Sequence, residues 1–471
     1  MSNVHTLPSS KRSDTVHTIN PATGKKIQNY TFQNKETIEE ITEHAHKAFL
    51  KWRETNMKKR AQLIQKFSDI LEANKEDLAK LMAEEMGKPV TQGQGEIDRC
   101  INICKYTAEE DYKTLADEER PLEGGKKGII TYQPIGVILG IQPWNFPLYQ
   151  VVRYAIPNLM AGNAVLLKHA KNVWGMATRV EEMIEEAGFP KNIFRSLFIE
   201  NDDVEDLIAN DKIRGVTLTG SAKAGKSVAS CASKHLKKTV LELGGSDPYI
   251  VLDDVDLDAV METCVTARVN NAGQTCIAAK RFIVIDSIYE EFKEKFVAAM
   301  QAVEYGDPLQ PDTQMGPLAR EDLRETLHEQ VQESIEKGAK CLLGGKLPDT
   351  EGYFYPSTVL ENIKPGMPAY DDELFGPVAG LFRAKDEDDA IRIANDHRYG
   401  LGGGVMSSNQ ERAIEVAKRI DTGMVSVNGY FGSQPNLPFG GVKQSGYGRE
   451  HGGFGIKEFV NIKSIYVGDE A

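Results

Sequence analysis

The middle of the chain alternates short apolar segments with longer amphipathic segments, and this alternation constrains the fold more than any other feature of the sequence. Apolar runs predict β-strands at residues 136–141, 163–168, 193–198, 215–219 and 239–243. Amphipathic segments between them predict helices at residues 147–159, 173–187, 204–209 and 222–233. Strands joined by helical crossovers form a parallel, doubly wound α/β sheet, whose ligands bind beyond the carboxyl ends of the strands.

A second alternation begins near residue 247 and predicts a second α/β domain. Its strands are predicted at residues 248–252, 280–285, 377–385, 402–406 and 422–427. Its helices are predicted at residues 256–270, 287–302, 320–337, 386–395 and 409–419. Residues 429–455 hold many glycines between aromatic and polar residues, which is typical of an ordered functional loop.

The first part of the chain is predicted to be mainly helical. Apolar positions recur at three- and four-residue intervals over residues 36–52, 58–86 and 95–113. Residues 121–128, PLEGGKKG, are rich in turn-forming and charged residues and predict a connector. The polar start, residues 1–18, lacks the apolar core of a secretory signal and predicts a mobile tail.

Charge and cysteine content argue against several classes of protein. The chain has 56 Lys and Arg residues against 69 Asp and Glu residues, and its net charge of -13 disfavours nucleic acid or an anionic membrane as a partner. No apolar run approaches the roughly 20 residues that a membrane-spanning helix needs. The six cysteines form no C-x-x-C pair and the nine histidines form no H-E-x-x-H motif, so we expect no disulfide framework and no metal. Sparse cysteines favour a cytoplasmic location.

Residues capable of chemistry gather at the ends of predicted strands and after one helix. They lie in segments 143–147 (PWNFP), 219–221 (TGS), 241–245 (LELGG) and 271–276 (NAGQTC). Cys276 has two interpretations, since a lone cysteine is most often a small buried apolar side chain. It can also be a nucleophile, because a thiol with the ordinary pKa of about 8.5 is partly ionised at neutral pH.

Glu242 and Asn145 also allow two interpretations each. Glu242 ends a predicted strand, where a carboxylate is either solvated or acts as a general base toward water or a thiol. Asn145 lies between aromatic residues and prolines, where it is either a turn residue or an amide donor to an oxyanion. The residue types alone leave these alternatives open.

Residues 220–227, GSAKAGKS, match the P-loop pattern G-x-x-x-x-G-K-S/T between a predicted strand and a predicted helix. A phosphohydrolase is therefore a remote alternative, with Lys226 on the phosphates and Asp253 holding magnesium. A helix N-terminus with small residues suits any phosphate, including the pyrophosphate of a dinucleotide. No G-x-G-x-x-G motif occurs, so an ordinary Rossmann dehydrogenase is not indicated.

Taken together, the order and spacing of several motifs resemble the aldehyde dehydrogenase superfamily from about residue 17 to the C-terminus. These motifs are PWNFP (143–147), LLK (166–168), TGS (219–221), LELGGSDP (241–248), GQTC (273–276), ELFGPV (373–378) and PFGGVKQSGYGRE (438–450). The resemblance implies two doubly wound α/β domains plus a small β oligomerisation arm. The implied parts are a dinucleotide-binding domain (1–115 and 135–244), a catalytic domain (245–445) and the arm (116–134 and 446–471), assembled as a homodimer or homotetramer.

The resemblance also implies roles for individual residues. Cys276 would be the nucleophile and Glu242 the general base, while Asn145 and the backbone N–H of Cys276 would stabilise an oxyanion. The residues implied to contact the cofactor are Trp144, Lys168, Gly220, Ser221, Leu243, Glu373 and Phe375. Glu450 resembles a residue that relays a proton in relatives. Together these roles imply oxidation of an aldehyde to a carboxylic acid through a cysteine thiohemiacetal and thioester.

Within the superfamily, segments 166–172, 241–252 and 316–331 most closely resemble bacterial succinate-semialdehyde dehydrogenases. Arg153 falls where that group carries an arginine for the substrate carboxylate, and the alternative interpretation is a surface arginine on a helix. Some of these enzymes carry a second arginine where this chain has Asn270, and Arg268 would point elsewhere. Glutarate semialdehyde or neutral aldehydes are therefore alternative substrates.

The cofactor preference depends on the residue three positions after Lys168. NAD-preferring relatives often carry a glutamate there, whereas this chain has Lys171, a cation that suits a 2′-phosphate. We therefore expect NADP to be used at least as well as NAD, with a solvated surface lysine as the alternative interpretation. Glu242 at the water-activating position favours hydrolysis over transfer of the acyl group to coenzyme A.

Overall fold

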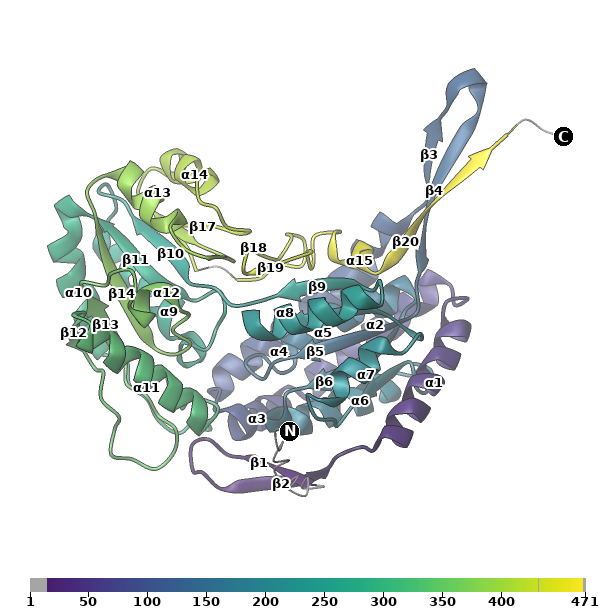
Figure 1. The fold of residues 1–471 in the computed structure, drawn as a ribbon, viewed down its shortest axis with the longest axis horizontal. Coiled ribbons are helices and arrows are strands. Elements are labelled where there is room, and N and C mark those ends of the chain that lie inside the picture. Colours follow the sequence, from purple (N-terminus) through teal and green to yellow (C-terminus); the bar gives the residue numbers. More distant parts are fainter. Residues whose placement is uncertain (1–14, 431, 469–471) are drawn as a thin grey trace, which may run out of the picture.

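The computed structural model describes residues 15–430 and 432–468, which contain two large sheets, one to the right and one to the left in Figure 1. The first sheet is built from β5 (Val137–Gln142), β6 (Ala164–His169), β7 (Phe194–Ser196), β8 (Ile213–Thr219) and β9 (Lys238–Glu242), in the order β19-β9-β8-β5-β6-β7. Its strands are parallel except for β19 (Gly446–Tyr447), which joins the edge beside β9. The predicted fold class is confirmed.

The crossovers of the first sheet are helical, as predicted. They are α5 (Tyr149–Ala161), α6 (Trp174–Glu186), α7 (Asp203–Ala209) and α8 (Ala222–Lys234). The first strand of this sheet along the chain, β5, lies in its middle. The next two strands, β6 and β7, extend the sheet on one side of β5, and β8 then pairs with the other side of β5. This reversal places a topological switch point between β5 and β8, where ligands bind in such folds.

The second sheet is also built from strands that alternate with helices along the chain. Its strands, in spatial order, are β12 (Lys340–Leu343), β13 (Thr358–Glu361), β14 (Val378–Ala384), β11 (Ala279–Ile285), β10 (Asp247–Val251), β16 (Gly404–Met406) and β17 (Ser426–Val427). Its helices are α9 (Leu257–Val269), α10 (Tyr289–Gln301), α11 (Glu321–Glu336), α12 (Pro368–Asp371), α13 (Glu387–Asn395) and α14 (Gln410–Lys418). Since β9 ends at Glu242 and β10 begins at Asp247, the carboxyl edge of the first sheet leads directly into the amino edge of the second.

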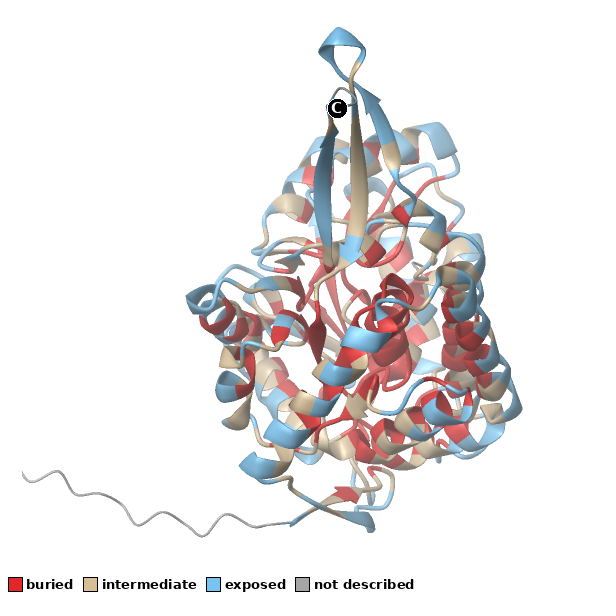
Figure 2. Ribbon diagram, turned by 90° about the vertical axis from the view of Figure 1, so that its right-hand side faces the viewer, coloured by how far each residue is buried: buried red, intermediate tan, exposed pale blue. Residues whose placement is uncertain are grey.

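A three-stranded antiparallel sheet projects from the body of the molecule (Figure 1). It consists of β3 (Glu118–Pro121), β4 (Lys127–Pro134) and β20 (Val460–Val467). The short helix α15 (Gly455–Glu458) directly precedes β20 in the chain. Most of its surface is exposed or half-buried (Figure 2). The predicted connector at residues 121–128 is confirmed for residues 122–126, whereas its ends belong to β3 and β4, whose exposed or half-buried residues lack the apolar alternation of a buried strand.

The N-terminal helices are α1 (Lys35–Trp52), α2 (Met57–Ala73), α3 (Lys75–Met86) and α4 (Val90–Glu109). The prediction of helix at residues 58–86 is confirmed, except that Asn74 divides it into α2 and α3; the Asn74 side chain donates to the carbonyl of Ile70 at 2.8 Å. Helix α4 begins directly after Pro89, before the predicted start at residue 95. Proline suits this position since it lacks the N–H that a helix start leaves unpaired.

The chain also forms two antiparallel pairs of short strands. β1 (Thr15–Ile19) pairs with β2 (Lys26–Thr31), and β15 (Tyr399–Gly400) pairs with β18 (Val442–Lys443). The predicted polar tail is thus wrong for residues 15–18, and residues 1–14 lie outside the described part of the chain. Within the described residues, no helix combines the length and the apolar character needed to cross a bilayer.

Candidate active site

The segment that carries Cys276 makes a tight turn between α9 and β11. Asn271, Ala272 and Gly273 have φ angles of 56°, 53° and 72°, a left-handed conformation that only glycine adopts without strain. A Cβ on Gly273 would lie 2.3 Å from the carbonyl oxygen of Gly376, so this position requires glycine. Arg268 is fully buried and donates to the Gly273 carbonyl at 2.7 Å. Arg268 therefore supports the turn and does not face a substrate.

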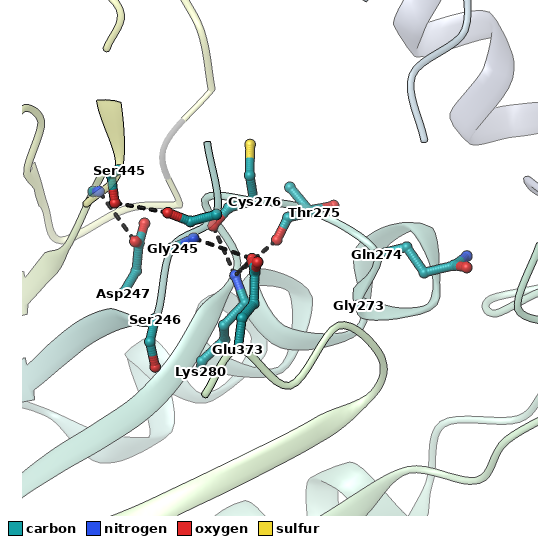
Figure 3. A network of polar contacts seen from close by, with 12 residues as sticks. Gly245, Ser246, Asp247, Gly273, Gln274, Thr275, Cys276, Lys280, Glu373 and Ser445 are labelled. Atoms are coloured by element: carbon teal, nitrogen blue, oxygen red, sulfur yellow. Dashed lines mark hydrogen bonds and ion pairs between the residues drawn. The ribbon is translucent and has the colours of Figure 1, made fainter. Parts of the chain in front are cut away.

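The backbone of Cys276 is held while its sulfur is left free of that network. Lys280 Nζ donates to the carbonyl oxygens of Cys276 at 2.7 Å and Thr275 at 3.0 Å. Figure 3 shows the sulfur pointing away from these contacts. Burial raises the pKa of the thiol to about 12, although the charges of Lys280 and Arg153 oppose the shift. Burial therefore disfavours the thiolate at neutral pH, and the thiol must release its proton before it can attack a substrate.

Asn145 lies on the loop after β5 and reaches the same turn. Its Nδ2 donates to the carbonyl of Gln274 at 3.0 Å, and its Oδ1 is buried without a hydrogen-bond partner among the described residues. Its backbone carbonyl accepts from Asn271 Nδ2 at 2.8 Å. An amide nitrogen carries two hydrogens, so Nδ2 keeps one donor for a ligand. The first sheet and the turn before β11 thus bring Asn145 beside the Cys276 segment.

Glu242 ends β9 and is only 2% exposed, so the solvated-carboxylate interpretation is wrong. Neither of its side-chain oxygens has a hydrogen-bond partner in the described part of the chain. The glycine-rich loop approaches it closely, since a Cβ on Gly440 would lie 2.7 Å from Glu242 Oε1. Burial, and then the charge of Glu450, raise the pKa of Glu242 well above its ordinary value, while Arg153 opposes the shift. A carboxyl group that is buried and unpaired in this way is suited to proton transfer.

Arg153 is a buried residue of α5, so the surface-arginine interpretation is wrong. Its guanidinium forms an ion pair with Glu450, and the two side chains are 1% and 7% exposed. It also donates to Thr219 Oγ1 at 3.1 Å and lies 4.5 Å from the ring centre of Phe439. The structure therefore joins Arg153, Glu450 and Glu242 in one charged cluster. The substrate-binding role of Arg153 and the proton-relay role of Glu450 stay predictions.

Two cavities open beside the carboxyl ends of the first sheet. One has a volume of about 550 Å³ and is lined by Lys168, Lys171 and Asn201, among others. The other has a volume of about 560 Å³ and is lined by Asn201, Ser221 and Lys223, among others. Lys168 Nζ donates to Asn201 Oδ1 at 2.6 Å, and burial, followed by the charge of Lys171, lowers the pKa of Lys168 to about 8. Both cavities are lined by Asn201, and lysine side chains on each give them positive charge that suits a phosphate-bearing ligand.

Lys171 is not the solvated lysine of the alternative interpretation. It forms an ion pair with Glu200, and the two side chains are 35% and 24% exposed. Its ammonium also lies 5.1 Å from the ring centre of Phe32. A phosphate that binds here must compete with the carboxylate of Glu200 for this cation.

The P-loop interpretation is wrong, because the matching residues do not form a loop. Ser221 is the N-cap of α8 and accepts from the backbone N–H of Ala224 at 3.2 Å, so Gly225, Lys226 and Ser227 lie inside the helix. A P-loop needs an extended run of backbone N–H groups before the helix begins. Asp253, the proposed magnesium ligand, lies in the turn after β10 of the second sheet and forms an ion pair with Arg412. The N-terminus of α8 still presents unpaired N–H groups beside Gly220.

The remaining predicted cofactor residues gather between the two sheets. Glu373 pairs with Lys280 at 3.2 Å and accepts from the backbone N–H of Gly245 at 3.2 Å (Figure 3). The rings of Trp144 and Phe375 meet edge to face, with centres 5.8 Å apart. Leu243 packs against the first turn of α8, since its Cδ atoms lie 2.7 Å from the Cβ position of Gly225.

Several supporting residues were not found from the sequence. Ser445 Oγ donates to the Gly244 carbonyl at 2.7 Å, and the only signal was its position in the glycine-rich loop. Lys280 and Arg281 are two cations in a strand whose other residues are apolar, and their place among apolar residues is the signal in the sequence that points to a supporting role for Lys280. No motif or spacing in the sequence marks Glu200 as the partner of Lys171. In the described ranges, no group of three His, Cys, Asp or Glu side chains is arranged to hold a metal ion.

The chain is similar to known enzymes over nearly its whole length. The profile of the aldehyde dehydrogenase family matches residues 8–465. A Deinococcus radiodurans protein named succinate-semialdehyde dehydrogenase, NADP(+), is 44% identical over 448 residues, covering 95% of this chain and 94% of that protein. One from Escherichia coli strain K12, named succinate semialdehyde dehydrogenase, NAD(P)+, is 42% identical over 448 residues and covers 95% and 97%. The crystal structure of succinic semialdehyde dehydrogenase from Streptococcus pyogenes in complex with NADP+ superposes with a TM-score of 0.94 at 38% identity, covering 96% of this chain and all of that one.

Proposed function

Because this chain belongs to the aldehyde dehydrogenase family, we propose that it oxidises succinate semialdehyde to succinate, with NADP or NAD as the electron acceptor. The observation that carries the proposal is the placement of Cys276, Asn145 and Glu242 at the junction of the two sheets. The relatives named above support the choice of substrate.

Each of these residues has one task in the proposed reaction. Cys276 releases its proton to solvent and its sulfur bonds to the aldehyde carbon as the C=O π electrons move to oxygen. The resulting thiohemiacetal alkoxide accepts hydrogen bonds from the Asn145 amide and the Cys276 N–H. A bound oxidised dinucleotide would supply the acceptor for the hydride that leaves that carbon as the thioester forms. Glu242 then removes a proton from the water that attacks the thioester, which releases the carboxylic acid and the thiol.

The residues on the first sheet fit a dinucleotide. We assign the adenosine half to the cavities that meet at Asn201, with Lys168 beside the ribose. The pyrophosphate would lie at the N-terminus of α8, next to Gly220 and Ser221. Lys171 would pair with a 2′-phosphate in place of Glu200, which supports the use of NADP.

The proposal also assigns parts of the chain to separate tasks. Residues 1–115 and 135–244 would bind the dinucleotide, residues 245–445 would carry the nucleophile, and residues 116–134 and 446–471 would pair with another copy in a homodimer or homotetramer. The exposed apolar side chains of Ile462, Ile465 and Tyr466 on β20 support such pairing. The six free cysteines are consistent with a cytoplasmic location.

One observation favours a broader substrate range as the second candidate. Glu450 already neutralises the guanidinium of Arg153, so this cation is less available to a substrate carboxylate. Glutarate semialdehyde and neutral aldehydes are the substrates that a less selective site would accept.

Initial rates with succinate semialdehyde, glutarate semialdehyde, acetaldehyde and betaine aldehyde, each with NADP and with NAD, test the proposal. We expect the highest kcat/KM with succinate semialdehyde. Equal values for charged and neutral aldehydes would establish the broader enzyme instead. Formation of an acyl-coenzyme A thioester in place of the free acid when coenzyme A is added would contradict the assigned role of Glu242.

A further inference from the structure

A buried ion pair outside the residues assigned so far, Lys88 with Glu96, contacts the loop that carries Asn145. We propose that Lys88 and Glu96 are positioning residues for the oxidation, which hold Asn145 where its side-chain amide can stabilise the alkoxide that forms on the substrate. The inference rests on the proposed function and extends it to the α3–α4 region, which supplies no residue that would touch the substrate.

Glu96 acts on the helix that follows the loop. It lies on α4 and is completely buried, and its Oε1 accepts the backbone N–H groups of Leu148 and Tyr149, each at 2.9 Å. These groups open α5, which has no side-chain cap of its own. A carboxylate at this place satisfies N–H groups that the helix cannot pair and interacts favourably with its dipole. Glu96 therefore fixes the point at which the Asn145 loop enters α5.

Lys88 acts on the loop itself. Its side chain is 1% exposed, it pairs with the other oxygen of Glu96, and Nζ donates to the backbone carbonyl of Asn145 at 2.9 Å. The same ammonium lies 3.8 Å from the ring centre of Phe146, the next residue of the loop. A lysine ammonium has three hydrogens, and the carboxylate of Glu96 and the carbonyl of Asn145 accept two of them. The carbonyl of Asn145 is thus held by a cation whose own position is fixed.

The contacts of Asn145 connect this ion pair to the nucleophile. The same carbonyl that Lys88 binds also accepts from Asn271 Nδ2 at 2.8 Å, and Asn271 begins the turn that leads to Cys276. Holding a backbone carbonyl fixes the peptide plane and hence the direction of the attached side chain. A displacement of about 1 Å in a catalytic group can lower the rate by roughly 10²-fold.

The stability of the fold gives no sufficient reason for a charged pair at this place. A buried ion pair seldom stabilises a protein more than a well-packed apolar pair of the same size. Apolar residues at positions 88 and 96 would, however, leave the Asn145 carbonyl and the first N–H groups of α5 without these partners. We therefore attribute the ion pair to its contacts with the Asn145 carbonyl and with the first N–H groups of α5.

The chain offers a matched control in Glu85. This residue lies on α3, is 1% exposed, and accepts the backbone N–H groups of Gly175 at 2.8 Å and Met176 at 3.1 Å. It thus supports the first turn of α6 as Glu96 supports the first turn of α5. None of the proposed catalytic residues lies on α6. Glu85→Gln therefore removes a similar carboxylate with a similar structural role.

The test compares Lys88→Met, Glu96→Gln and Glu85→Gln by steady-state kinetics with succinate semialdehyde and by thermal unfolding. We expect Lys88→Met to lower kcat by roughly 30- to 100-fold and Glu96→Gln by roughly 10-fold, because the oxyanion donor is displaced but not removed. KM should change by less than about threefold in both variants, since the aldehyde is not contacted. Glu85→Gln should lower the melting temperature by about as much as Glu96→Gln does, while its kcat stays within about twofold of the wild-type value.

A double-mutant cycle separates positioning from general destabilisation. If Lys88 acts through Asn145, Lys88→Met should have almost no further effect on kcat in the Asn145→Ala background. Glu96→Gln gives the same cycle with a milder change if Lys88→Met folds poorly. The inference would be overturned if Glu85→Gln lost as much kcat as Glu96→Gln. It would also be overturned if the effects of Lys88→Met and Glu96→Gln on kcat simply added to that of Asn145→Ala. Either result would leave the proposed function intact. A wild-type protein that oxidises no aldehyde would overturn both.

Discussion

The two ends of the candidate site differ in how much water reaches them. At the end that carries Cys276, the charged residues Glu242 and Glu450 are 2% and 5% exposed. At the dinucleotide end, Lys171 is 35% exposed along its side chain and lines an open cavity of about 550 Å³. Charges interact strongly where water is excluded and weakly where solvent screens them. We therefore expect substitutions at the buried end to change rates by much larger factors than substitutions at the open end.

Cys276→Ala should have the largest effect. The proposed bond to the substrate forms at this sulfur, so NADPH or NADH formation should fall by at least about 10⁴-fold. The matched control is Cys341→Ala, since Cys341 is also partly exposed but donates only to carbonyls of its own turn. The control should keep full activity. Measurable turnover by Cys276→Ala would mean that the buried end is not where the chemistry occurs.

Glu242→Gln should separate the two halves of the reaction. If Glu242 activates water, kcat should fall by about 10²- to 10⁴-fold, which is the usual contribution of a general base. Hydride transfer comes first, so a rapid burst of reduced dinucleotide close to one equivalent should remain in stopped-flow absorbance. Loss of the burst would place Glu242 at the thiol step instead. The amide should also raise the melting temperature at pH 8, because it removes a buried carboxylate that has no hydrogen-bond partner among the described residues.

Much of the two-sheet fold could be predicted from the sequence, because buried strands and amphipathic helices leave strong periodic patterns. The break at Asn74 could not, since the apolar period continues across it and only a side-chain hydrogen bond to Ile70 ends α2. The strands β3, β4 and β20 could not either, because they contain no fully buried residue and therefore show no alternation of buried and exposed positions.

The residues of the candidate site could be proposed from the sequence, but their burial and their ion pairs could not. Cys276, Glu242 and Asn145 stand at strand ends or turns, which is where polar residues carry chemistry in such folds. The pairing of Arg153 with Glu450 depends on the glycine-rich loop folding back over α5, and no local pattern encodes that contact. The raised pKa values of Glu242 and Cys276 also follow from burial by distant segments and are therefore visible only in the structure.

The pH dependence of the rate should reflect those raised pKa values. Both Cys276 and Glu242 act in the deprotonated form, and burial favours the protonated form of each. Activity should therefore rise with pH through the neutral range, by roughly 10-fold for each group per pH unit below its pKa. Initial rates between pH 6 and pH 9 at saturating dinucleotide measure this rise. A rate independent of pH in that range would show that the groups are already ionised.

The stability of the fold should change with pH in the opposite direction. A carboxyl whose pKa is raised on folding stabilises the folded state below its ordinary pKa, and that contribution is lost as the pH rises through the raised value. The pKa of Glu242 is raised in this way. The melting temperature of wild type should thus fall relative to that of Glu242→Gln as the pH increases. A constant difference between the two proteins would contradict the raised pKa.

Lys171→Ala should have a moderate effect that is confined to one dinucleotide. Loss of a partly screened cation should lower kcat/KM with NADP by about 10-fold and leave NAD nearly unchanged. Glu200→Gln should shift the preference toward NADP, because it frees Lys171 from its ion pair. The ratio of kcat/KM values for the two dinucleotides measures both effects. A wild-type ratio that favours NAD by tenfold or more would remove the role assigned to Lys171.

Lys226→Ala should have the smallest effect, although this lysine completes the P-loop pattern in the sequence. Lys226 is exposed within α8, and its Nζ makes one long contact of 3.5 Å, to Gln444 Oε1. Neighbouring Lys223, by contrast, lines the cavity assigned to the adenosine half. Lys226→Ala should keep kcat/KM within about twofold, since an exposed side chain away from such features contributes little. Lys223→Ala should raise the KM of the dinucleotide by a few-fold at most, because solvent screens that charge. A larger effect at Lys226 than at Lys223 would mean that the phosphates follow the sequence motif, and the placement of the open end would then be wrong.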